Sequence, residues 1–176
     1  MPLKPPVSKT DHLLGENEAA IEIVEYGDYQ CPYCREAHPV IKRFMKEFQG
    51  HVKFVFRNFP LKEIHRFADI AARAAESASL QGKFWQMHDA IYENQEQLNE
   101  AFLFTLAEAL SLDKQKFEQD LRSSFLEARI DADLESGIRS GVNGTPTFFI
   151  NGKKFDGDAT DVLNLLKAAL SPISTI

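Results

Sequence analysis

Cys31-Pro32-Tyr33-Cys34 is the stretch that decides the fold, because it holds both cysteines of the 176-residue chain. The residues before it, 21–26, are Ile-Glu-Ile-Val-Glu-Tyr and predict a β-strand. The residues after it, 35–48, predict a helix. Cys31 then lies at the N-terminal end of this helix, where free backbone N–H groups and the helix dipole stabilise a thiolate. We therefore expect Cys31 to be an exposed nucleophile with a lowered pKa, and Cys34 to be a shielded thiol that resolves the mixed disulfide.

Two prolines bear on where this helix begins. Pro32 suits the first turn, where its missing N–H needs no partner. Pro39 does not suit a helix interior, and we expect it to kink the helix beyond the cysteines. A second interpretation has the helix begin only at Pro39, with both cysteines in a loop.

A Cys-x-x-Cys pair can also be half of a zinc site. Tetrahedral zinc needs four ligands, and the chain has no second cysteine pair. His38 is the nearby candidate for a third ligand, four residues after Cys34, and a fourth ligand would have to come from remote sequence. We therefore predict a redox pair, with no metal and no cofactor beyond the Cys31–Cys34 disulfide.

Composition places the chain among ordinary globular proteins. It is 44% hydrophobic and 26% charged, which is enough for one good core. Its formal net charge of −6 and the absence of a basic stripe argue against a nucleic-acid or anionic-membrane surface. The expected partners are protein thiols, small-molecule thiols and an unidentified redox partner.

The first fifteen residues contain three prolines and no apolar run long enough for a signal peptide or a membrane span. As written, the sequence predicts a cytoplasmic protein. If a native leader has been removed, the location is periplasmic or otherwise extracytoplasmic. Paired cysteines in a reducing compartment are more often catalytic than structural.

The remaining sequence alternates between strand and helix patterns. A second strand is predicted over 51–57, followed by a helical stretch over 61–140. Strands return at 147–150 and 153–155 on either side of Asn151-Gly152, a two-residue hairpin turn. A last helix is predicted over 158–170, capped by Asp158 with Asp161 three residues on.

This order, the Cys-x-x-Cys helix and Gly144-Thr145-Pro146-Thr147 together resemble the DsbA family of thiol-disulfide oxidoreductases. The resemblance runs from about Asp11 to Leu170. It implies an α/β, thioredoxin-like fold with an inserted all-helical domain. On this basis we expect a flexible N-terminal segment over 1–15, a thioredoxin-like domain over 16–60 and 141–176, and an inserted helical domain over 61–140.

The resemblance also assigns roles to residues of this chain. It implies that Cys31 is the nucleophile, that Cys34 resolves, and that Pro146 follows a cis bond, with the Thr145 backbone pairing with a substrate strand. It places a buried carboxylate at Glu25. Near two sulfurs this carboxyl would have a raised pKa and could exchange protons with Cys34. The alternatives are an ordinary trans loop proline and a carboxylate that faces solvent at the end of its strand.

The motif departs from the best-known oxidase pattern at Tyr33, where that pattern has histidine after Pro32. A neutral tyrosine brings no positive charge to the thiolate, so we expect a milder oxidant. Pro-Tyr also occurs in glutaredoxins, which keeps glutathione possible as an electron partner. Two alternatives to an exchange enzyme stay open: a peptide-binding or partner-binding module whose thiols act only as a redox latch, and a glutathione-dependent transferase or isomerase of the kappa type, against which the intact pair argues.

Overall fold

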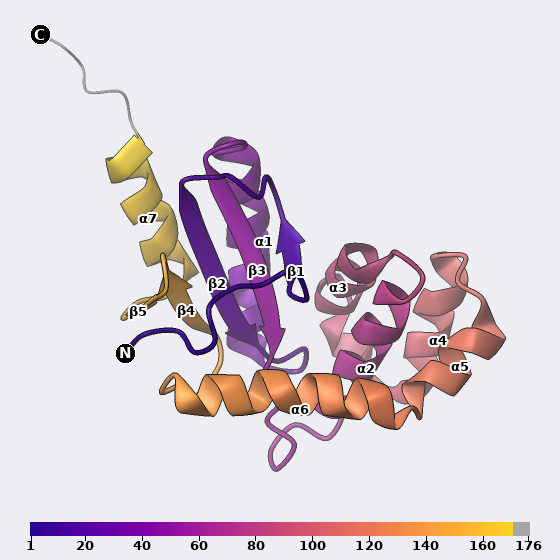
Figure 1. The fold of residues 1–176 in the computed structure, drawn as a ribbon. Coiled ribbons are helices and arrows are strands. Elements are labelled where there is room, and N and C mark those ends of the chain that lie inside the picture. Colours follow the sequence, from indigo (N-terminus) through magenta and orange to yellow (C-terminus); the bar gives the residue numbers. More distant parts are fainter. Residues whose placement is uncertain (171–176) are drawn as a thin grey trace, which may run out of the picture.

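The computed structural model describes residues 1–170 and contains a five-stranded mixed sheet (Figure 1). Its strands lie in the order β1-β3-β2-β4-β5, with β2 and β3 parallel and the other neighbours antiparallel. The strands are β1 (His12–Leu14), β2 (Ile21–Gly27), β3 (Val52–Asn58), β4 (Thr147–Ile150) and β5 (Lys153–Phe155). The expected α/β thioredoxin-like fold is confirmed by this arrangement.

Helix α1 (Pro32–Glu47) connects the two parallel strands, and α7 (Ala159–Leu170) packs beside it. Between β3 and β4 the described chain forms a helical region with α2 (Ala68–Ser79), α3 (Phe84–Glu93), α4 (Glu100–Ala109), α5 (Lys114–Leu121), α6 (Ser124–Arg139) and the short 3-10 helix η1 (Gln95–Gln97). Figure 1 shows α2 to α5 gathered beside the sheet, while α6 runs from this group back across the end of the sheet.

Side-chain alternation along β2 separates two apolar clusters. Ile23 packs with α1, α7 and the helical region, whereas Val24 and Tyr26 pack on the opposite face with Val55 and Phe149. Since successive residues of a strand point to opposite faces, Glu25 points to the same side as Ile23. The strand thereby aims one carboxyl at the face that α1 covers.

Local sequence rules predicted several element boundaries correctly. Helix α1 begins at Pro32 with Cys31 as its N-cap, so the interpretation that starts the helix at Pro39 is wrong. Asn151 and Gly152 both have positive φ, as a two-residue hairpin turn between β4 and β5 requires. The carboxylate of Asp158 accepts the backbone N–H groups of Thr160 and Asp161, which caps α7.

The N-terminal segment, expected to be flexible over 1–15, instead lies along the sheet. β1 pairs with β3, Pro2 bridges to Lys153, and the backbone N–H of Leu3 donates to the Gly152 carbonyl over 2.8 Å. This packing differs from the expected flexible segment, because contacts with residues far along the chain hold it in place. The backbone carbonyls of Pro5 and Pro6 accept hydrogen bonds from a buried cation.

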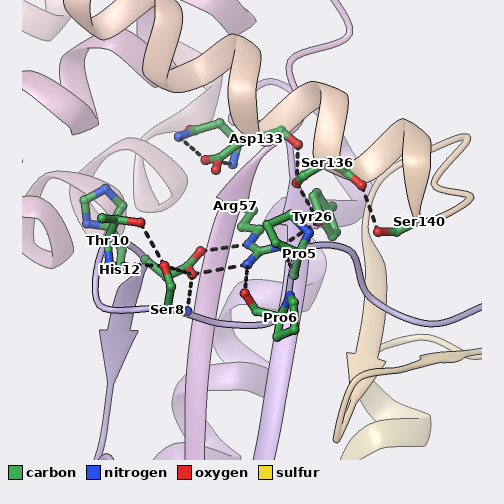
Figure 2. A network of polar contacts seen from close by, with 12 residues as sticks. Pro5, Pro6, Ser8, Thr10, His12, Tyr26, Arg57, Asp133, Ser136 and Ser140 are labelled. Atoms are coloured by element: carbon green, nitrogen blue, oxygen red, sulfur yellow. Dashed lines mark hydrogen bonds and ion pairs between the residues drawn. The ribbon is translucent and has the colours of Figure 1, made fainter.

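That cation is Arg57, which β3 directs at the N-terminal segment (Figure 2). Its guanidinium donates to both carboxylate oxygens of Asp11, at 2.7 and 3.1 Å, and to the carbonyls of Pro5 and Pro6. It also donates to the Tyr26 hydroxyl over 3.0 Å. The Arg57 and Asp11 side chains are only 2% and 6% exposed, so each satisfies a buried charge of the other.

The helical region does not stand apart from the sheet. Its helices share one apolar cluster with α1 and β3, and α6 contacts β3 directly. A Cβ on Gly137 of α6 would lie 2.7 Å from the Phe59 ring, so this glycine permits the close approach. Residues 171–176 of the expected thioredoxin-like domain lie outside the described residues. No helix within 1–170 is long and apolar enough to cross a membrane.

We predict that Asp11→Ala lowers the free energy of unfolding by about 3 kcal/mol, because it leaves the buried Arg57 guanidinium without its carboxylate. Urea denaturation measures this. Glu47→Ala is the matched control, since Glu47 pairs with Arg43 on the surface over 3.6 Å and its loss should cost less than about 0.5 kcal/mol. Equal effects of the two substitutions would mean that the N-terminal segment is not held by Arg57.

Candidate active site

The two cysteines lie at the start of α1, where the strand-to-helix connection places them. Cys31 is the N-cap residue and Cys34 lies in the first turn, and both are free thiols. Their residues are 4% and 1% exposed. The expectation of an exposed Cys31 is therefore wrong. Within the motif it is Tyr33 that faces solvent, at 67% exposure.

What distinguishes the cysteines is their proton affinity. A hydrogen bond from the Cys34 thiol is the largest cause that lowers the pKa of Cys31, to about 5. Burial opposes this shift, while a contact with Thr145 and hydrogen bonds from the backbone N–H groups of Cys34 and Tyr33 add to it. Burial raises the pKa of Cys34 well above its usual range, and the bond to Cys31 and the nearby Glu25 charge raise it further. At neutral pH Cys31 is thus a thiolate and Cys34 a thiol.

Glu25 is 1% exposed and lies beside this pair. Its Oε1 is buried and has no hydrogen-bond partner, so the burial of this oxygen is not compensated. Burial, and to a smaller extent the charge of Cys31, raises the pKa of Glu25 to about 8. The carboxyl is therefore mostly protonated at pH 7.

Because Gly27 has no side chain, it leaves room for the Glu25 carboxyl. A Cβ at Gly27 would stand 2.4 Å from the Phe56 ring and 3.0 Å from Glu25 Oε1. In the parallel pairing Glu25 is opposite Phe56, so an aromatic ring covers the carboxyl from β3. A larger residue at Gly27 would displace one or the other.

The Thr145–Pro146 loop covers the cysteines from the other side. The Thr145–Pro146 peptide bond is cis. The Cys31 thiol lies 3.3 Å from the Thr145 carbonyl oxygen, across 114 residues of sequence. A groove of about 300 Å³ opens beside this contact. It is lined by Tyr33, Ala37 and Val40 of α1, by Thr145 and Pro146, and by residues 157–160 at the start of α7.

Two site residues were missed by the sequence analysis. The buried Asp28 carboxylate accepts from the backbone N–H of Gln30 and Leu61 and contacts His65 Nδ1, which fixes the turn that leads into Cys31. Gln95 donates to the Cys31 carbonyl over 2.9 Å. Asp28 fits the sequence pattern of an Asx turn, so its role could have been predicted. Gln95 is 64 residues from Cys31, and no local pattern predicts their contact.

His38 lies near the motif without joining it. Among the residues that the structure describes, it forms a cluster of potential metal ligands with His88 and Asp89, and no cysteine belongs to that cluster. Arg35 pairs with the exposed Glu96 over 2.8 Å. The half-zinc interpretation of Cys31, Cys34 and His38 therefore finds no support in the geometry.

The sheet order and the buried dithiol at the start of α1 place the chain in the class of thioredoxin-fold proteins. The family described as Thioredoxin matches residues 7–168, and the chain belongs to it. Among solved structures, a thioredoxin-like oxidoreductase from Silicibacter pomeroyi is 27% identical, with a TM-score of 0.78 over 92% of this chain and 93% of that one. Wolbachia pipientis alpha-DsbA1 shares the fold at 22% identity, with a TM-score of 0.81 and 92% of each chain covered.

Curated relatives carry a different name. A protein of Salinispora arenicola named Na(+)/H(+) antiporter NhaA 1 is 42% identical over 84% of this chain, and one of Mycolicibacterium vanbaalenii is 37% identical over 94%. The chain spans only 22% and 28% of the lengths of these relatives. They are therefore much longer proteins, of which the matched part is one segment.

We predict that Cys34→Ser and Cys34→Ala affect Cys31 differently. A serine hydroxyl can still donate to the Cys31 thiolate, so its pKa should stay near 5, whereas alanine removes the largest stabilising contact and should raise it. Alkylation rates between about pH 4 and pH 9 measure both. A Cys31→Ser variant whose Cys34 is alkylated faster at pH 6 than Cys31 in the Cys34→Ser variant would contradict the assignment.

Proposed function

We propose that the chain is a thiol-disulfide oxidoreductase in which Cys31 is the nucleophile and Cys34 the resolving thiol. The observation that carries this proposal is the opposite shift of the two sulfurs, with the pKa of Cys31 lowered to about 5 and that of Cys34 raised. A structural dithiol needs no such separation, whereas an exchange reaction needs one thiolate and one proton donor.

In the reductive direction, the Cys31 thiolate attacks a substrate disulfide, and one substrate sulfur leaves as a thiolate. Cys34 then loses its proton and attacks Cys31 Sγ, which forms the Cys31–Cys34 disulfide and releases the second substrate sulfur. In the oxidative direction the same steps run backwards. Direction is set by the potential of the pair relative to its compartment, cytoplasmic or extracytoplasmic, and about 30 mV corresponds to ~1.4 kcal/mol.

We propose that Glu25 accepts the proton that Cys34 loses in the resolving step. The Cys34 thiol has a raised pKa and cannot ionise unaided near neutrality. A carboxylate with a pKa of about 8 is a stronger base than an ordinary glutamate, and it can return the proton once exchange is complete. The structural support is that Glu25 lies close enough for its charge to raise the pKa of Cys34.

The Thr145–Pro146 loop is the proposed substrate-binding edge. An extended peptide beside Thr145 would bring its sulfur close to Cys31, since the Thr145 carbonyl lies 3.3 Å from that thiol. The adjoining groove offers Val40 and Ala37 as apolar contacts for neighbouring side chains. Protein thiols fit this edge, and glutathione is short enough to use the same backbone contact.

Turnover separates the proposed enzyme from the redox latch. Wild-type protein should reduce insulin with excess dithiothreitol through many cycles, and Cys31→Ser should reduce the rate to the level of the reductant alone. A stoichiometric change without cycling would support the latch and overturn the proposal. Activity that requires glutathione and survives Cys34→Ser would support the kappa-type alternative.

We predict that Glu25→Gln leaves the fold intact and slows resolution of the mixed disulfide, because a neutral amide cannot accept the Cys34 proton. In the wild type, the ionised fraction of Glu25 falls about tenfold per pH unit below 8, so resolution should slow as pH falls through that value. Stopped-flow resolution of a preformed mixed disulfide measures this. The proposed role fails if the variant retains the wild-type rate and pH profile.

Substitution of Tyr33 tests how the motif sets the reduction potential of the cysteine pair, since its exposed side chain can be changed without repacking the core. Tyr33→His should lower the pKa of Cys31 further, because an imidazolium attracts the thiolate. The reduced form is then stabilised, and the reduction potential should rise by about 30 mV for each unit of pKa. Tyr33→Phe is the control and should leave the potential unchanged in a glutathione buffer. Equal potentials for all three proteins would show that this position does not tune the pair.

The redox partner is also a proposal. The names of the curated relatives make a membrane antiporter one candidate, since segments similar to this chain occur within proteins so named. Cys34→Ser should trap partners as mixed disulfides on Cys31, because the resolving step is then blocked. A trapped transporter would support this candidate, and capture of other thiol proteins alone would exclude it.

A further inference from the structure

A small, partly open space lies behind the active-site helix, between α1 and α3. Its volume is about 20 Å³, which is room for one water-sized occupant. His38 of α1 and His88 and Asp89 of α3 line it, and each offers one ligand atom within 4.8 Å of the others. Apolar side chains from β1, α1, β3 and α3 form the remaining wall, together with Lys42.

The His38 side chain is 6% exposed, and its Nε2 has no hydrogen-bond partner. A buried imidazole nitrogen normally has one, because losing a partner in the interior costs free energy. Asp89 Oδ1 lies 3.5 Å from this nitrogen. Two ligands bound to a tetrahedral ion at about 2.1 Å lie about 3.4 Å apart, so this pair already has the spacing of two zinc ligands.

His88 is oriented for the same purpose. Its Nδ1 lies 3.0 Å from the Tyr29 hydroxyl, which leaves Nε2 as the free nitrogen. If Nδ1–H donates to the Tyr29 oxygen, Nε2 carries the lone pair that a metal needs, and Tyr29 then acts as the outer partner that fixes the tautomer.

We propose that His38, His88 and Asp89 form a binding site for one divalent cation of the zinc type. Two imidazoles and a carboxylate are the donors that Zn²⁺ accepts, and Ca²⁺ and Mg²⁺ prefer oxygen ligands alone. Glu93 lies outside this three-residue group, with its Oε1 4.0 Å from His38 Nε2, and its side chain would have to move inward to become a fourth ligand. A bound ion would fasten α1, four residues beyond Cys34, to α3 of the helical region.

Lys42 competes with such an ion. Its ammonium lies 3.1 Å from Asp89 Oδ2 and 2.8 Å from Glu93 Oε1. Its side chain is 48% exposed, so it can swing into solvent when a cation arrives. Asp89 Oδ1 faces His38 in any case, so Lys42 weakens the site without blocking it. Because of this competition, removing the Lys42 ammonium should strengthen cation binding, whereas removing the Asp89 carboxylate should weaken it.

The test is calorimetric titration of Zn²⁺ into the full chain carrying Cys31→Ser and Cys34→Ser, so that no thiolate binds the metal. One Zn²⁺ per chain is expected, with thermal unfolding raised by about 5 °C at a hundredfold excess over Kd. Adding Asp89→Asn, a half-exposed position that should still fold, is expected to weaken binding at least about tenfold. Adding Lys42→Met should tighten it severalfold.

His51→Ala is the matched control, because His51 is exposed and distant from the site in sequence, and binding should not change. Absence of Zn²⁺ binding, binding that Asp89→Asn leaves intact, or binding that His51→Ala abolishes would each overturn the proposal. The imidazole resonances of His38 and His88 should shift on Zn²⁺ addition and not on Mg²⁺ addition. Because the background lacks both cysteines, the result is independent of the proposed exchange activity.

Discussion

Burial of the Glu25 carboxyl beside the two sulfurs is the constraint on which the rest of the site depends. Raising its pKa from 4.5 to about 8 means that ionising this group costs roughly 5 kcal/mol more than in water. The folded protein therefore binds a proton that the unfolded chain releases. The stability of the folded state that depends on this carboxyl being neutral is fully present below pH 4.5 and is lost as pH rises through 8. In exchange for this loss of stability, the protein keeps beside Cys34 a carboxyl that can accept the Cys34 proton and return it.

The fold creates this arrangement from ordinary parts. Strand alternation turns Glu25 toward α1, and the short connection after Gly27 brings the helix start directly over it. The Phe56 ring excludes water from one side, and the Thr145–Pro146 loop covers Cys31 from another. On the opposite face of the sheet, Arg57 ties Tyr26, the neighbour of Glu25, to the N-terminal segment. Both faces of β2 are therefore fixed next to the reactive residues.

The sequence predicted those features that local rules govern. Strand alternation, proline at the first helical position, Asn151-Gly152 and the Asp158 cap each act within a few residues, so their outcome could be read directly. The resemblance to a known family added Glu25 and Thr145-Pro146. What escaped prediction depends on distant pairs: Asp11 with Arg57, Gln95 with Cys31, and the Thr145 carbonyl that helps to bury Cys31. No local pattern encodes a contact between residues 46 to 114 positions apart.

The most direct measurement of this account is an NMR titration of the Glu25 side-chain carboxyl in the reduced protein, with Glu25→Gln used to assign the resonance. The account predicts a midpoint near pH 8, well above the 4.5 of an ordinary glutamate. A midpoint close to 4.5 would show that the carboxyl is solvated and ionised at neutral pH. It would then be no reservoir for the Cys34 proton, and the central claim would be contradicted.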